Sequence, residues 1–154
     1  MDYVTLKWLH VMSSTFLFGT GVGSAFYLLF ATLSRDVRAI AVVTRYVVLA
    51  DWLFTATTAV IQPLTGYYLM RLAGFPMTST WLWWSIILYA VAIACWLPVV
   101  WLQMRMRTLA RQAMEGNLPL PMAYWRYFWS WVALGVPAFF AFVAVFYLMV
   151  AKPA

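Results

Sequence analysis

The chain contains one histidine, His10, and one acidic residue inside a long apolar run, Asp51. A neutral imidazole can ligate haem iron, form hydrogen bonds or lie at a membrane surface. A carboxylate inside a membrane span costs about 2.5 to 3.5 kcal/mol on insertion scales, so such a residue normally has a partner or a role. These two residues are therefore the first candidates for chemistry.

Polar residues follow Asp51 at helical spacing and form one stripe, which consists of Asp51, Thr55, Thr58, Gln62 and Thr65. Residues at these spacings share one face of a helix. A polar face inside a membrane should turn to the bundle interior and hydrogen-bond there. For Asp51 we favour an ion pair with Arg105 or Arg126, with proton relay as the alternative. Gln62, next to Pro63, is expected to serve the carbonyls that the proline frees.

A second, weaker polar face runs along the first apolar run and consists of His10, Ser14, Leu17, Gly21 and Ser24. The pair Gly19 and Gly23 predicts a close approach by the backbone of a neighbouring helix. Both faces are also explained by interhelical packing alone.

The composition identifies the elements that must position these residues. The chain is 66% hydrophobic and 9% charged, whereas a soluble domain has about 25% charged residues. A membrane helix needs roughly 20 apolar residues, and four runs qualify, at about residues 8–33, 46–70, 81–102 and 127–151. We predict an all-α polytopic membrane protein. It forms a single domain, residues 1–154, in which four transmembrane helices make a bundle kinked at Pro63, Pro98 and Pro137.

The basic residues predict the orientation in the membrane. One side carries seven, namely Arg35, Arg38, Arg45, Arg105, Arg107, Arg111 and Arg126, and the other side carries three, namely Lys7, Arg71 and Lys152. The side with seven is expected to be cytoplasmic. Both termini would then be periplasmic, in a bacterial inner membrane. Because these residues gather at loops and form no basic face, nucleic acid is not an expected partner.

His10 lies one helical turn inside Lys7, in the outer leaflet. Thr65, Tyr68, Trp84, Ser85 and Tyr147 are expected at the same depth. We predict a haem b site there, with His10 as metal ligand, Tyr68 and Trp84 beside the porphyrin, and Lys7 and Arg71 near its propionates. The alternative, in which His10 is only an interfacial or hydrogen-bonded residue, stays open.

Four stretches resemble an uncharacterised bacterial family of four-helix integral membrane proteins: "MDYVTLKWLHVMSSTFLFGTGVGSAFYLLFA", "VVLADWLFTATTAVIQPLTGYYL", "ACWLPVVWLQMRMR" and "LGVPAFFAFVAVFYLMVAKP". More distantly, "LKWLHV" is similar to the Lys-x-x-His start of the HemJ-type protoporphyrinogen oxidases, which are grouped with the CopD-type copper-resistance proteins. The resemblance implies haem b bound through a histidine of the first helix, here His10. HemJ-type sequences have a second histidine near the end of that helix. Because this chain reads "FYLLFATLS" there, the resemblance does not extend to the oxidase activity.

Three functions follow from these observations. The first is a haem b-binding membrane redox protein, an oxidoreductase if it is an enzyme. The second is a non-catalytic membrane subunit that assembles as a homo-oligomer or with a redox partner protein. The third, and least favoured, is a carrier of copper or another small solute. Cu(I) prefers thioether ligands, and the closest methionines, Met104 and Met106, lie on opposite sides of their helix.

Overall fold

The computed structural model describes residues 2–153, and the regular secondary structure of these residues is entirely helical. The helices are α1 (Tyr3–Leu33), α2 (Val37–Ala50), the π-helix η1 (Asp51–Thr55), α3 (Ala56–Ala73), α4 (Thr80–Glu115) and α5 (Met122–Ala151). The α2, η1 and α3 segments are continuous, so the chain forms four helices that are long and apolar enough to cross a membrane. The predicted all-α fold class is confirmed.

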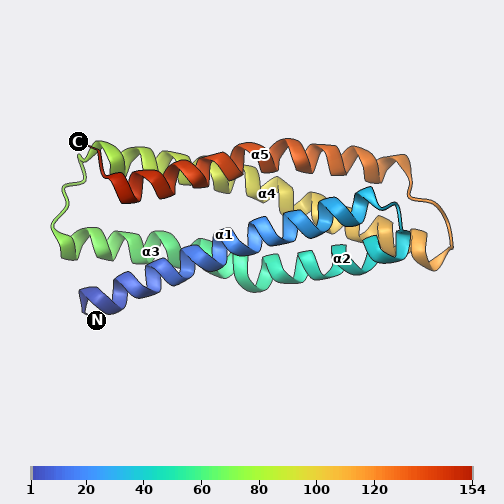
Figure 1. Ribbon diagram of the computed structural model, residues 1–154, viewed down its shortest axis with the longest axis horizontal. Helices are drawn as coiled ribbons and strands as arrows, with labels where there is room; N and C mark the ends of the chain where they lie inside the picture. The colour runs from blue at the N-terminus through green and yellow to red at the C-terminus, as the bar shows by residue number, and fades with distance from the viewer. Residues whose placement is uncertain (1, 154) are drawn as a thin grey trace.

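The four helices form an elongated bundle in which both termini lie at one end, together with the α3–α4 connection (Figure 1). We call this the terminal end. The opposite end holds the α1–α2 and α4–α5 connections. α4 packs along α5, and α1 packs against α3, η1 and α2. α2 packs against α4 as well, so the α1–α3 side and the α4–α5 side are joined mainly in the half near the opposite end.

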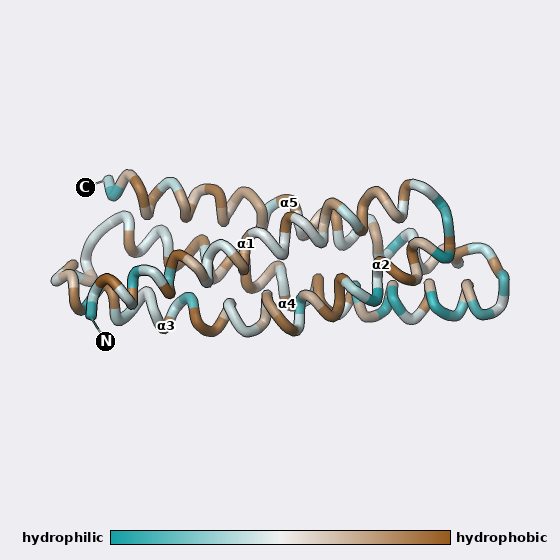
Figure 2. The backbone as a smooth tube through the Cα atoms, turned by 60° about the horizontal axis from the view of Figure 1, so that its bottom comes forward, coloured by the Kyte–Doolittle hydropathy of each residue, from teal (hydrophilic) through white to brown (hydrophobic). Residues whose placement is uncertain are grey.

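The larger core cluster lies in that same half. Ile40, Met106, Tyr124 and Phe128 are fully buried there. The Thr32 and Tyr124 hydroxyls form a hydrogen bond of 2.9 Å across the α1–α5 interface. Apolar residues occur all along the tube (Figure 2), since much of the outer surface must match lipid rather than water.

Two of the helix ends carry ordinary capping interactions and two do not. The Asp36 carboxylate accepts hydrogen bonds from the Arg38 and Ala39 amides and so caps α2. Gly74, with φ 71°, ends α3 in the left-handed region. Ser79 occupies the N-cap position of α4, but its hydroxyl donates to the Pro76 carbonyl instead of capping the helix. Pro121 takes the N-cap position of α5 and has no side-chain group to cap the helix.

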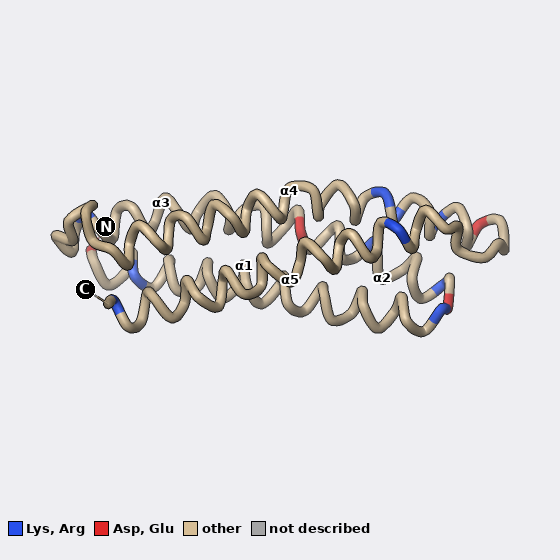
Figure 3. The backbone as a smooth tube through the Cα atoms, turned by 90° about the horizontal axis from the view of Figure 1, so that it is seen from above, with Lys and Arg blue, Asp and Glu red and all other residues tan. Residues whose placement is uncertain are grey.

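Charged residues lie toward the two ends of the bundle, apart from Asp51 at the start of η1 (Figure 3). At the opposite end, the Arg35 guanidinium lies 6.0 Å from the ring centroid of Trp125. At the terminal end, the Lys152 ammonium lies 4.7 Å from the Phe75 ring. The distribution matches a membrane-spanning body with polar surfaces at both ends.

Candidate functional site

His10 lies in the seam between α1 and α3, where both of its ring nitrogens have partners on α3. Nδ1 is 2.8 Å from the Thr65 hydroxyl oxygen, and Nε2 is 3.2 Å from the Gln62 side-chain nitrogen. The Ser13 hydroxyl, one turn further along α1, bonds to the other end of the Gln62 amide. Two helices are thus joined by a polar network within the membrane span.

The network defines one form of the His10 imidazole. The Gln62 amide directs its oxygen at Ser13 and its nitrogen at His10, so Gln62 donates to Nε2. Nε2 is then the acceptor, and the ring proton resides on Nδ1, which donates to Thr65. The Thr65 hydroxyl in turn donates to the Ile61 carbonyl at 2.8 Å. His10 is therefore neutral, with its Nε2 lone pair covered by an amide.

Gly66 allows the imidazole to lie against the backbone of α3. A Cβ atom at this position would lie 3.2 Å from His10 Cε1, closer than ordinary van der Waals contact. The close approach that the sequence analysis predicted at Gly19 and Gly23 does not occur, because nothing lies within 4 Å of a Cβ built at either position. Gly66 was missed because a single glycine in a helix gives no spacing signal.

The other residues predicted around the cofactor do not converge on His10. The Tyr68 and Trp84 side chains are 58% and 54% exposed and lie on the outer surface of the bundle, as does Tyr147. The Lys7 ammonium lies 5.8 Å from the ring centroid of Tyr3, and Arg71 is exposed. Sharing a depth with His10 does not place a residue on the same face, and aromatic residues near helix ends favour the lipid interface.

Asp51 is buried at the start of η1, and its partner is not an arginine. The Thr55 hydroxyl donates to Asp51 Oδ1 at 3.0 Å within the π-helix. The predicted ion pair with Arg105 or Arg126 is wrong: between residues 2 and 153 the only ion pair joins Arg111 to Glu115. The Arg105 guanidinium instead lies 5.4 Å from the Trp101 ring. A long arginine side chain reaches the polar interface more readily than it enters the bundle.

The polar stripe turns inward. Asp51, Thr55, Thr58 and Thr65 are buried and Gln62 is half-buried.

Gln62 does not serve the carbonyl that Pro63 frees, because its amide is bonded to Ser13 and His10. The Tyr89 hydroxyl on α4 performs that role by donating to the Ala59 carbonyl at 2.6 Å, four residues before the proline. Tyr89 was missed because nothing in its local sequence relates it to Pro63.

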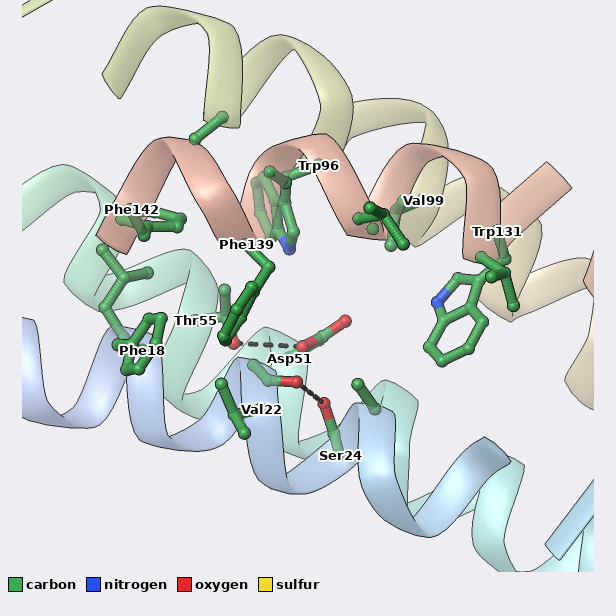
Figure 4. Close-up of a pocket in the computed structure, with 18 of the residues that line it drawn as sticks. Phe18, Val22, Ser24, Asp51, Thr55, Trp96, Val99, Trp131, Phe139 and Phe142 are labelled. Carbon is green, nitrogen blue, oxygen red and sulfur yellow. Dashed lines mark hydrogen bonds between the residues drawn. The ribbon is translucent and has the colours of Figure 1, made fainter. Parts of the chain in front are cut away.

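A cavity of about 430 Å³ lies between the α1–η1 side and the α4–α5 side of the bundle, next to Asp51 (Figure 4). Its walls are apolar and largely aromatic, and they include Phe18, Trp96, Trp131, Phe139 and Phe142. Three buried polar atoms on lining residues have no hydrogen-bond partner: Asp51 Oδ2, Trp96 Nε1 and Gln103 Oε1. Buried polar atoms without a hydrogen-bond partner are rare in folded proteins, so their presence here needs an explanation.

A family of predicted integral membrane proteins, DUF2269, matches residues 4–153, which is nearly the whole chain. The chain belongs to this family. No curated protein and no solved structure matches it. Membership in DUF2269, together with the four long apolar helices, makes the chain an integral, multi-pass membrane protein.

Within this DUF2269 chain, the side chains limit the kinds of metal site. No group of three or more His, Cys, Asp or Glu residues among the described positions could hold a metal ion. Met104 and Met106 differ in surroundings, since Met106 is fully buried and Met104 is exposed. The described residues therefore offer no cluster of strong protein ligands that could hold a metal ion without further ligands.

Proposed function

We propose that this protein binds haem b through His10 Nε2 and serves a redox role in the membrane. The observation that carries the proposal is the hydrogen bond from His10 Nδ1 to Thr65. A histidine that ligates a metal normally donates its other ring N–H to a neighbouring acceptor, which fixes the tautomer and aims the ligating nitrogen. Thr65 provides that acceptor, so Nε2 is the nitrogen available to iron.

The protein side chains that could act as metal ligands at His10 suit haem iron better than a free metal ion. Because no three His, Cys, Asp or Glu residues gather into a metal site among the described positions, a metal at His10 would have to bring further ligands of its own, as iron in a porphyrin does. The geometry sets one condition, since the Gln62 amide now covers Nε2 at 3.2 Å. Gln62 must release Nε2 before iron can bind.

Each residue of the network then has a defined task. Thr65 holds the ring orientation and keeps the proton on Nδ1. Gly66 leaves room for the ring against α3. Haem, when bound, supplies one-electron chemistry. The similarity of "LKWLHV" to the HemJ-type start supports this role without extending it to a substrate.

Absorbance spectroscopy tests the proposal on protein purified in detergent from haem-replete cells, before and after dithionite. We expect a Soret band in the wild type that is lost in His10→Ala. Gln62→Leu should bind added hemin more tightly than the wild type does, since it removes the group that competes for Nε2. Cys95→Ala, remote from the network in sequence, serves as the control. A colourless wild type that gains no band with hemin contradicts the proposal, as does an unchanged band in His10→Ala.

The proposed location is a bacterial inner membrane with both termini in the periplasm. The excess of arginines at the opposite end supports this orientation, because positively charged loops remain in the cytoplasm. His10 would then lie in the outer leaflet.

A further inference from the structure

We propose that the cavity beside Asp51 binds a lipid-soluble phenol, whose hydroxyl group pairs with the unpartnered polar atoms in its wall. The site is separate from His10 and does not depend on haem binding. It lies where the second span changes from α2 to the π-helix η1, with α4 and α5 facing it. Single π-helical turns inside α-helices occur frequently at functional sites.

The polar atoms of this wall indicate a ligand. Asp51 and Gln103 are only 3% and 4% exposed, and the Gln103 amide lies beside the Asp51 carboxyl. Even so, Asp51 Oδ2 and Gln103 Oε1 lack partners, and so does the Trp96 indole N–H. Figure 4 shows the indole nitrogen of Trp96 turned toward the Asp51 side of the cavity. The lining of the cavity therefore offers two acceptors and one donor, from η1 on one side and from α4 on the other.

The combination of donor and acceptors selects a hydroxyl group. A ketone or ether can accept from Trp96 but leaves both oxygens unpaired. An ammonium group can donate to the oxygens but offers Trp96 nothing, and a carboxylate can accept from Trp96 but has no proton to donate to Asp51 or Gln103. A hydroxyl accepts from the Trp96 N–H and donates to Asp51 or Gln103 with the same oxygen atom.

The apolar walls of the cavity favour a ligand whose hydroxyl group is carried by an aromatic ring. Phe18, Trp131, Phe139 and Phe142 offer ring faces and edges to a bound ring. A volume of about 430 Å³ lies in the range of small-molecule sites, roughly 300 to 1,000 Å³. Val22, Phe26 and Phe140 line the cavity and are also exposed on the lipid-facing surface. A lipid-soluble molecule can therefore enter from the bilayer.

Calorimetric titration of the full chain in nanodiscs tests the proposal, with 4-pentylphenol and pentylbenzene as matched probes and empty nanodiscs as the partition baseline. We expect the wild type to bind the phenol at least about tenfold more tightly than pentylbenzene, in proportion to the cost of leaving buried polar groups without a partner. Asp51→Asn and Trp96→Phe should each reduce this preference several-fold while pentylbenzene binding is retained. Equal affinities for the two probes in the wild type would overturn the proposal.

A pair of glycine variants tests whether the cavity is the binding site, even if the polar variants fold poorly. Gly21 lines the cavity and Gly19 does not, and a Cβ at either position meets nothing within 4 Å. Gly21→Leu should fill the cavity and abolish binding of both probes, whereas Gly19→Leu should bind like the wild type. Binding that survives Gly21→Leu, or that is lost equally in both variants, contradicts the assignment.

Discussion

His10 is positioned by neutral hydrogen bonds and by a close backbone, without any charged partner. Thr65 and Gln62 hold its two nitrogens, and Gly66 lies under its ring. Within a membrane such a network has no water to replace a lost partner, so its members depend on one another. The same absence of water makes the unpartnered atoms at Asp51, Trp96 and Gln103 notable.

Gly66→Ala should destabilise the protein relative to Gly19→Ala. Both changes add the same methyl group inside a helix, so the gain in helix propensity cancels between them. Only at Gly66 does the new Cβ press on the His10 ring, at 3.2 Å, while two hydrogen bonds hold the ring in place. We expect a difference of about 1 to 2 kcal/mol, typical of mild overpacking. Thermal unfolding in detergent measures it, and equal midpoints for the two variants would show that the ring is not held there.

At the level of single residues, the sequence predicts part of the candidate site. The stripe from Asp51 to Thr65 follows from helical spacing, and Thr65 was expected at the depth of His10. Ser13, Gly66 and Tyr89 were not predicted, since each acts through a contact with another helix. One-dimensional spacing gives the face of a single helix but not its rotation against a neighbour. The expected partners of Asp51 and Gln62 were wrong for this reason.

The π-helix η1 lies on the span that contributes residues to both sites. It begins with Asp51 beside the cavity, and α3 continues from it to the residues around His10. A π-helical turn holds one more residue than the α-helix would, so it sets the rotation of α3 relative to α2. The 4-3-4-3 spacing of the stripe is the same as in an uninterrupted α-helix, which is why the sequence gives no sign of η1.

Deletion of Leu53 should remove this extra residue and disrupt the α1–α3 seam. Converting η1 to α-helix rotates α3 against α2 by roughly 100°, one residue of helical turn. Gln62, Thr65 and Gly66 would then leave His10. We expect a large fall in the thermal midpoint of the deletion variant. Leu53→Ala, which keeps the length and changes a lipid-exposed side chain, should stay close to the wild type. If the deletion variant and Leu53→Ala have the same thermal midpoint, η1 does not set the position of α3.

The whole molecule combines a tightly joined half with a looser one. α2 joins α1 to α4 near the opposite end, where the larger core cluster lies. The number of spans and the fold class could be predicted from hydropathy alone, because a bilayer requires long apolar helices. The cavity could not be predicted, because it depends on how α1 and η1 lie against α4 and α5.

The proposed orientation in the membrane places both termini outside the cytoplasm. Fusions of alkaline phosphatase, which is active only outside the cytoplasm, should be active at each terminus of the full chain. Fusions of a fluorescent protein that folds only in the cytoplasm should be dark at the same positions. A fluorescent C-terminal fusion would place the seven arginines outside and reverse the proposed location of His10.

Pulsed EPR tests the central claim most directly, that His10 is an iron ligand. Because the chain has a single histidine, labelling with nitrogen-15 histidine marks this one ring. After reconstitution with unlabelled ferric haem, we predict a nitrogen-15 hyperfine coupling of the strength of a directly bonded imidazole. That coupling should be absent in His10→Ala. Bound haem without any such coupling in the wild type would contradict the claim.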